Sequence, residues 1–208
     1  LILAKQEFAE ALDKGCPLVI GGPLPHVMAA KAVAFIEAMK PEFQDYAARI
    51  IQNAQSLAEG LRAEGLKVLT GGTENHLLLV DVSEINGLNG KQAENALRGG
   101  GITLNRNSLP FDANGPWYTS GLRFGTAALT SRGLGQEEMS QIARLIAKIL
   151  KNTKPNILTG GKNAGKPSKN KCETDATVQN EVRRTVQDIL QRFPLYPQLD
   201  RELLYRLL

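Results

Sequence analysis

Apolar residues recur every three or four positions along much of the chain, as expected for helices that bury one face. The longest such run begins after Pro41 and ends at Gly65; a proline favours a helix start and a glycine a helix end. The predicted helices cover residues 6–13, 27–39, 41–65, 91–98, 136–152 and 178–190. We expect the first of them to stop at the Lys-Gly-Cys-Pro sequence of residues 14–17, and Pro25 stands where the second could start.

Short apolar runs between these helices predict strands. They cover residues 1–4, 66–70, 76–82, 102–105 and a segment around Arg123, with a turn over 71–75. Strands that alternate with helices predict an α/β or α+β lobe of about 80 residues, near the low end for domains. The apolar opening run, without a leading turn, is typical of a buried strand, and we expect the chain to be the later portion of something larger.

The composition changes after residue 152. Residues 153–174 are dominated by Lys, Asn and Gly and offer little to bury, which predicts an exposed flexible linker in preference to a nucleic-acid-binding arm. Residues 175–208 form a C-terminal helix and tail, and we expect that helix to dock on the body because an isolated helix is marginally stable.

The net charge of +4 does not change this picture, since five lysines fall within residues 154–171 and the rest is nearly balanced. No apolar run approaches the length that crosses a bilayer. Cys16 and Cys172 are far apart and lie in no metal-binding spacing. We therefore expect a cytoplasmic protein with no nucleic-acid partner, no membrane partner and no metal.

Arg123 is the first candidate for binding an anion. It lies between Gly121 and Gly125, and its guanidinium offers a planar fork of donors that matches a carboxylate or a phosphate. The alternative is a structural salt bridge, which is the commoner role of a lone arginine. Gly21 and Gly22 could present backbone N–H groups to a phosphate, although a tight turn between two elements is the commoner role of two such glycines.

Five ordered blocks of the sequence, with a sixth near its end, resemble the serine hydroxymethyltransferase family. They are Gly-Gly-Pro-Leu with a following histidine at 21–26, Gly-Gly-Thr-Glu-Asn-His at 71–76, Asn-Arg-Asn at 105–107, Thr-Ser-Gly-Leu-Arg-Phe-Gly-Thr at 119–126, Arg-Gly at 132–133 and Arg-Phe-Pro-Leu-Tyr-Pro at 192–197. The resemblance covers the chain from residue 1 to about 151 and resumes at the last block.

The resemblance implies a pyridoxal-phosphate enzyme of the aspartate-aminotransferase-like fold (fold type I), acting as a homodimer. Residues 1–40 would end the large cofactor-binding domain, 41–65 would be a connecting helix and 66–152 the small α+β domain. The enzyme would transfer a one-carbon unit between serine and tetrahydrofolate, giving glycine and methylenetetrahydrofolate. The implied site comprises Arg123 for the substrate carboxylate, Gly21 and Gly22 for the cofactor phosphate across the dimer interface, and Asn107, Gly115, Pro116 and Trp117 for folate. His26 and His76 are expected to be structural.

The sequence also departs from the family. The Schiff-base lysine of the family precedes the strand that matches the start of this chain, and Lys5 follows that strand, so we expect this chain alone to be inactive. Residues 18–20 replace a Gly-Gly-Gln run, and Trp117 and Ala127 stand where phenylalanine and proline are common. A related pyridoxal-phosphate racemase or aldolase, or a non-catalytic dimerisation or binding fragment, remain alternative interpretations.

Overall fold

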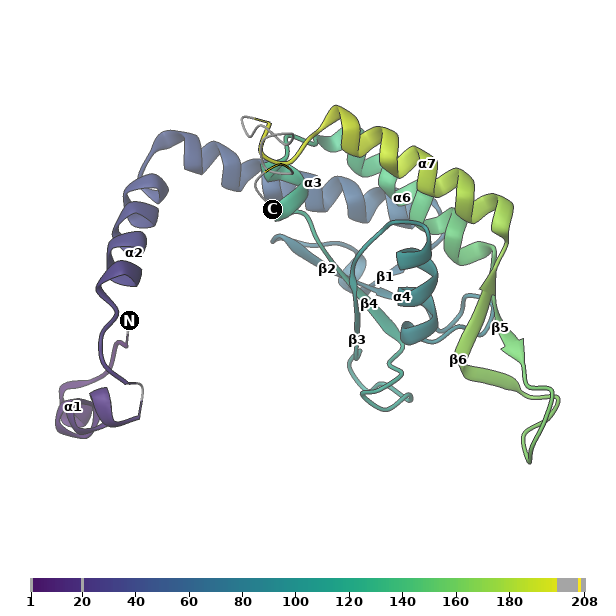
Figure 1. Cartoon of the computed structure of the whole chain (residues 1–208), viewed down its shortest axis with the longest axis horizontal. Coiled ribbons are helices and arrows are strands. Elements are labelled where there is room, and N and C mark those ends of the chain that lie inside the picture. The colour runs from purple at the N-terminus through teal and green to yellow at the C-terminus, as the bar shows by residue number, and fades with distance from the viewer. Residues whose placement is uncertain (1, 20, 198–205, 207–208) are drawn as a thin grey trace. The chain divides into compact units, whose positions relative to one another are not determined.

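The computed structural model describes residues 2–19, 21–197 and 206. The chain forms two compact units, Leu1–Asp45 and Tyr46–Leu208. The first unit contains η1 (Gln6–Phe8), α1 (Ala9–Leu18), α2 (Pro25–Ala38) and the beginning of α3 (Pro41–Ala63) (Figure 1).

The strand predicted over residues 1–4 is wrong for residues 2–4, while Leu1 lies outside the described residues. Ile2 to Ala4 are exposed and have no regular secondary structure, because no strand among the described residues pairs with them. The predicted stop after residue 13 is a kink: α1 continues to Leu18 and bends at Cys16, which has φ −106° and ψ 111°. Cys16 precedes a proline, whose ring disfavours helical geometry in the preceding residue. The predicted start at Pro25 is confirmed, with proline in the first turn of α2.

The second unit is built on a four-stranded antiparallel sheet of order β1-β2-β4-β3. The strands are β1 (Lys67–Val68), β2 (Leu77–Asp81), β3 (Asn105–Asn107) and β4 (Gly121–Gly125). The helices are the rest of α3, then α4 (Gly90–Gly99), α5 (Ala127–Ser131), α6 (Gln136–Lys151) and α7 (Ala176–Arg192).

Two of the strands predicted in the second unit differ by more than one residue from those observed. The strand expected over 66–70 shortens to β1 because Thr70 and Gly71 have positive φ angles of 57° and 75°, within the short helix η2 (Leu69–Gly71). The strand expected over 102–105 begins only at Asn105, because the N–H of Ile102 donates to the Leu97 carbonyl (2.9 Å) at the end of α4.

Helices cover the inner face of the sheet and form one apolar core with it (Figure 1). Successive side chains of a strand point to opposite faces, so Leu78 and Val80 on β2, with Leu122 and Phe124 on β4, face the core. The fully buried helical residues packed over them include Leu57, Leu61, Leu97, Met139, Ile146 and Leu150. The same alternation leaves the residues between them on the outer face.

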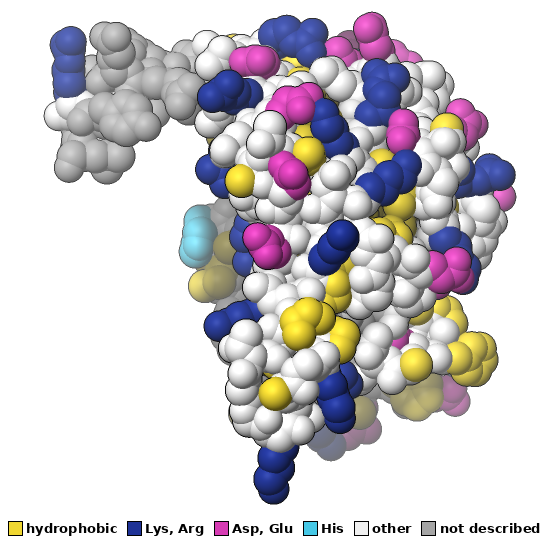
Figure 2. Space-filling model, turned by 90° about the vertical axis from the view of Figure 1, so that its right-hand side faces the viewer, with side chains coloured by type: hydrophobic (Ala, Val, Ile, Leu, Met, Phe, Trp, Pro, Cys, Tyr) yellow, Lys and Arg dark blue, Asp and Glu magenta, His cyan; other side chains and the backbone are white. Residues whose placement is uncertain are grey.

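The flexible linker predicted over residues 153–174 is wrong: this segment is an antiparallel hairpin of β5 (Thr153–Ile157) and β6 (Pro167–Thr174). Lys and Arg side chains are spread over the side of the second unit that carries it (Figure 2). The hairpin is held by hydrogen bonds to the start of α4. Asn89 Nδ2 donates to the Lys169 carbonyl (2.9 Å), and Gln92 Nε2 donates to the carbonyls of Ser168 (2.6 Å) and Lys171 (3.0 Å).

These contacts follow from the way in which α4 begins. Asn89 and Gln92 form a capping box, in which each side-chain oxygen accepts the backbone N–H of the other residue. Both amide nitrogens are therefore left as donors for the hairpin. The hairpin is thus held in place by hydrogen bonds to polar side chains. A prediction based on the number of apolar residues in the segment could not detect them.

The predicted docking of the C-terminal helix is confirmed. Val182 and Ile189 on α7 are buried in the common core, and α7 runs along α6 (Figure 1). Arg132 holds the C-terminal end of α7, because its Nε donates to the carbonyl of Phe193 (2.9 Å), the residue that follows the helix. Most of the tail expected after this helix, residues 198–205 and 207–208, lies outside the described residues.

Candidate functional site

Arg123 lies at the middle of β4, on the outer face of the sheet. Its neighbours Leu122 and Phe124 are buried, whereas Arg123 is exposed. The register places it between Leu79 of β2 and Asn105 of β3. The pairing on both sides of β4 thus fixes the position of the arginine backbone on this face of the sheet.

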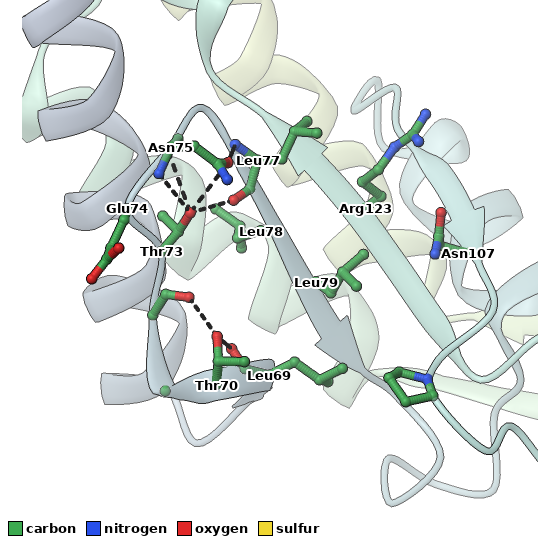
Figure 3. Close-up of a pocket in the computed structure, with 13 residues that line it drawn as sticks. Leu69, Thr70, Thr73, Glu74, Asn75, Leu77, Leu78, Leu79, Asn107 and Arg123 are labelled. Carbon is green, nitrogen blue, oxygen red and sulfur yellow. Dashed lines mark hydrogen bonds between the residues drawn. The ribbon is translucent and has the colours of Figure 1, made fainter.

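A cavity of about 860 Å³ lies over this outer face (Figure 3). Leu77 and Leu79 form an apolar side, and Arg123 and Asn107 from adjacent strands supply polar groups. Within the described part of the chain, the guanidinium of Arg123 has no hydrogen-bond or ion-pair partner. The alternative role in a structural salt bridge is therefore not observed there, and the fork of donors is free for an anionic ligand.

The turn over residues 70–77 borders one side of this cavity and is fixed by its own side chains. Thr73 Oγ1 donates to the Leu77 carbonyl (2.5 Å), and Asn75 Oδ1 accepts the N–H of Leu77 (2.8 Å). Thr70 Oγ1 donates to the carbonyls of Leu69 (2.6 Å) and Gly72 (3.1 Å). The bonds among these residues are visible in Figure 3, and they give the cavity a defined wall.

The loop between β3 and β4 is organised by Asp112. Its Oδ1 accepts from Asn114 N (2.8 Å) and Ser120 Oγ (2.6 Å), and its Oδ2 accepts from Leu109 N (3.1 Å) and Ser120 N (2.8 Å). Burial by itself would raise the pKa of Asp112, but the donors, led by the Ser120 hydroxyl, lower the pKa below its ordinary value of 3.8. The carboxylate is therefore charged at neutral pH and ties both ends of the loop together.

A second, smaller cavity of about 400 Å³ lies beside the loop. It is lined by Asn107, Pro116 and Thr119, and by the ion pair of Arg106 with Glu94 (2.7 Å). Asn107 lines both cavities, and its Nδ2 donates to the carbonyl of Ser108 (2.7 Å). Of the expected folate residues, the structure thus brings Asn107 and Pro116 together at one cavity.

Trp117 is 61% exposed and has two cations near its ring. Lys91 Nζ is 4.7 Å from the centre of its ring, and the guanidinium carbon of Arg106 is 5.5 Å away. Gly115, two residues earlier, is exposed and accepts the N–H groups of Tyr118 and Thr119 at its carbonyl (both 3.0 Å). Neither Trp117 nor Gly115 lines either cavity, so their expected contact with folate is not tested by the cavities.

Gly21 and Gly22 lie in the first unit. Gly21 has φ +78°, a conformation that favours glycine, and no atom lies within 4 Å of a Cβ built on either residue. Their N–H groups donate to no acceptor among the described residues. Free N–H groups in an open glycine turn fit a phosphate ligand.

Other candidates give no site among the described residues. His26 and His76 are exposed, and their expected structural role stays a prediction. No group of three or more His, Cys, Asp or Glu side chains in the described ranges could hold a metal ion. A search of the same residues finds no helix that is long and apolar enough to span a membrane.

Sequence reasoning missed Asp112, the Thr73 turn and the position of Lys91 next to Trp117. The Asn-x-x-Gln spacing at residues 89–92 was an available signal for the capping box that positions Lys91. No comparable spacing identifies Asp112, because its partners include a residue eight positions away.

Comparison with known proteins gives one family. The model of "Serine hydroxymethyltransferase" matches residues 4–146. The chain is 56% identical to the serine hydroxymethyltransferase of Treponema pallidum (strain Nichols), over 98% of this chain and 34% of that protein. It is 53% identical to the one of Salinispora tropica, over 96% of this chain and 41% of the relative, and 49% identical to that of Chlamydia muridarum, over 98% and 40%.

The chain therefore spans about a third to two fifths of the length of these curated relatives. The matched region contains the sheet, Arg123, Asn107 and the loop of Asp112. With a family model over more than half of its length and an α/β structure of mixed helices and sheets, the chain belongs to the serine hydroxymethyltransferase family.

Proposed function

We propose that the chain is the C-terminal portion of a cytoplasmic, homodimeric serine hydroxymethyltransferase of pyridoxal-phosphate fold type I. The whole enzyme would interconvert serine and tetrahydrofolate with glycine and 5,10-methylenetetrahydrofolate. The observation that carries the proposal is the guanidinium of Arg123, which has no partner among the described residues and lies in an open cavity on the outer face of the sheet. Relatives that bear the name of this enzyme and share about half of the residues support it.

Arg123 would bind the carboxylate of serine or glycine. A guanidinium can donate two parallel hydrogen bonds to a carboxylate, which fixes the orientation of the amino acid as well as its position. The nearby Leu77 and Leu79 side chains displace water on one side, and a charge-assisted bond is stronger where water is excluded. β4 holds the arginine between two neighbouring strands, so the substrate would meet a preformed group.

Asn107 and the loop residues Gly115, Pro116 and Trp117 would border the folate. Asn107 lines both cavities, so an amino acid held by Arg123 and a pterin in the second cavity would lie next to each other. With its Nδ2 engaged by the Ser108 carbonyl, the Asn107 side chain offers its oxygen as an acceptor. Such proximity is what transfer of a one-carbon unit requires.

Gly21 and Gly22 would hold the phosphate of pyridoxal phosphate through their N–H groups, which have no acceptor among the described residues. When bound, this cofactor withdraws electrons from the α-carbon of the amino acid, and the protein supplies orientation and charge. The residues of this chain would thus bind and orient both reactants.

A partner for the first unit is supported by α2. Its Met28, Val33, Phe35 and Ile36 are exposed, and α2 has no buried residue in the described chain. A helix that is apolar all round is normally covered by protein, and we propose that a second copy and the remainder of the enzyme cover it. Light scattering of the full-length protein should give the mass of a dimer.

The test of the function is Arg123→Lys in the full-length enzyme. Lysine keeps the charge and loses the fork, so the KM for serine should rise about ten- to a hundredfold, the cost of one to two charge-assisted bonds. Arg144→Lys, at an exposed residue without a described partner, is the matched control. An unchanged KM and kcat for serine would rule out the assignment, and turnover that does not need tetrahydrofolate would favour a racemase or aldolase.

A further inference from the structure

The first turn of α4 lies between the hairpin and the loop that carries Trp117. On one side, Asn89 and Gln92 hold the hairpin by its backbone carbonyls. On the other side, the N–H groups of Gly90 and Lys91 donate to the carbonyls of Thr119 (3.0 Å) and Tyr118 (2.9 Å). Both segments are therefore attached to the same four residues.

Side chains link the two segments through Lys91. Its Nζ donates to Asn170 Oδ1 on β6 (2.9 Å) and lies 4.7 Å from the ring centre of Trp117 and 5.8 Å from that of Tyr118. Lys169, next to Asn170, is 5.7 Å from the ring centre of Tyr118. Lys91 is half-buried and makes no ion pair among the described residues, so the rings and the Asn170 amide are its partners.

We propose that the hairpin of residues 153–174 positions the Trp117 loop, with Lys91 as the positioning residue and Asn170 as its support. A lysine side chain has four rotatable bonds and by itself would hold a neighbouring ring poorly. The bond from Asn170 fixes the ammonium group against the faces of Trp117 and Tyr118, where the attraction of a cation to an aromatic ring is available. The lysine-rich segment thus acts as a support for the loop, not as a linker.

The consequence for catalysis rests on the proposed function, in which this loop borders folate. A loop held in its binding conformation costs less to order when the ligand arrives. Loss of the support should therefore weaken the binding of tetrahydrofolate and leave the serine site on β4 unchanged, since Arg123 makes no hydrogen bond or ion pair with the hairpin among the described residues.

The experiment compares Asn170→Ala and Lys91→Met with the wild type in the full-length enzyme. The reporters are the amides of Tyr118 and Thr119, which are bonded to the Gly115 carbonyl and exchange only when the loop opens. Their hydrogen exchange should become about two- to fivefold faster in both variants, because this factor corresponds to the free energy of one cation–aromatic contact. The KM for tetrahydrofolate should rise by a similar factor, with the KM for serine and kcat unchanged.

Lys162→Ala is the matched control, because Lys162 lies on the same hairpin, is exposed and makes no hydrogen bond, ion pair or ring contact with Lys91 or the loop among the described residues. Lys91→Arg, which keeps the cation and donors, should restore most of the protection. Unchanged exchange in both test variants, or an equal change in Lys162→Ala, would overturn the inference. Faster exchange with an unchanged KM for tetrahydrofolate would support the positioning role and would instead overturn the assignment of the loop to folate.

Discussion

Replacing Asp112 by Asn should loosen the loop between β3 and β4. The loop contains two residues that are not glycine at positive φ, Phe111 (59°) and Thr119 (56°), and such conformations cost about 1–3 kcal/mol each. The four hydrogen bonds accepted by the Asp112 carboxylate hold this strained loop closed.

The cost follows from the geometry of the carboxylate. If the new amide nitrogen takes the place of Oδ1, the Ser120 hydroxyl can reverse and accept from it, and only the Asn114 N–H loses its acceptor. If the nitrogen takes the place of Oδ2, the N–H groups of Leu109 and Ser120 both lose theirs. The first orientation is cheaper. In this orientation one hydrogen bond is lost and the remaining ones are no longer made to a charged group. At a half-buried site this costs about 2 kcal/mol, which increases the equilibrium constant for loop opening about thirtyfold.

The assay is hydrogen exchange at the amides of Leu109, Asn114 and Ser120, expressed as protection factors. They should fall about thirtyfold in Asp112→Asn at neutral pH, with Asp188→Asn as a control because Asp188 is exposed and has no described partner. Unchanged protection in Asp112→Asn, or an equal loss in Asp188→Asn, would refute the reasoning.

The pH dependence of the protection factors of the same amides provides a second test. The pKa of Asp112 is lower in the folded protein than its ordinary value of 3.8. The contribution of the Asp112 carboxylate to the stability of the loop is therefore complete above pH 3.8, and it is lost as the pH falls through the lower pKa of the folded state. Wild-type protection should decrease in this acidic range, whereas Asp112→Asn should show no such step.

Two further predictions concern stability, measured by urea unfolding of the chain. Asn53→Ala should destabilise by about 2–3 kcal/mol, because the buried Asn53 amide donates to Thr130 Oγ1 (2.8 Å) and to the Leu134 carbonyl (3.0 Å), and both acceptors would lose their partner. Gly60→Ala gains about 1 kcal/mol of helix propensity, but a Cβ there would lie 2.7 Å from Ala143 Cβ. The cost of this steric clash should exceed the gain in helix propensity, so the free energy of unfolding should fall by about 1–2 kcal/mol. A second substitution in the same chain, Ala143→Gly, should recover most of this loss.

Much of the second unit could be predicted from its pattern. The alternation Leu122, Arg123, Phe124 places the arginine opposite two core residues, and the observed strand agrees because a period of two leaves no other choice once one face is buried. The helices α3, α4, α6 and α7 were equally accessible, because their apolar stripes and their end signals are both local in sequence. The short helix α5 (Ala127–Ser131) was not predicted.

The first unit shows where such reasoning fails. Residues 2–4 have the composition of a buried strand, but a strand forms only when another strand supplies its hydrogen bonds, and none is present among the described residues. The prediction for residues 153–174 was wrong in the opposite sense, because a segment expected to be a flexible linker forms a hairpin. Its lysines and asparagines have low strand propensity, yet the Gln92 amide and the Thr153 and Thr174 hydroxyls (2.9 Å apart) fix it.

The candidate site required information that is not local. Arg123 and Asn107 could each be identified as single residues, but their shared cavity depends on β3 pairing with β4 across the Asp112 loop, with Asn105 opposite Arg123. A shift of one residue in that register would turn Asn107 to the buried face. Asp112 closes the loop between the two strands, and Lys91 contacts its outer part. The residues that could not be predicted from the sequence, Asp112 and Lys91, are thus the ones that set the geometry between the residues that could.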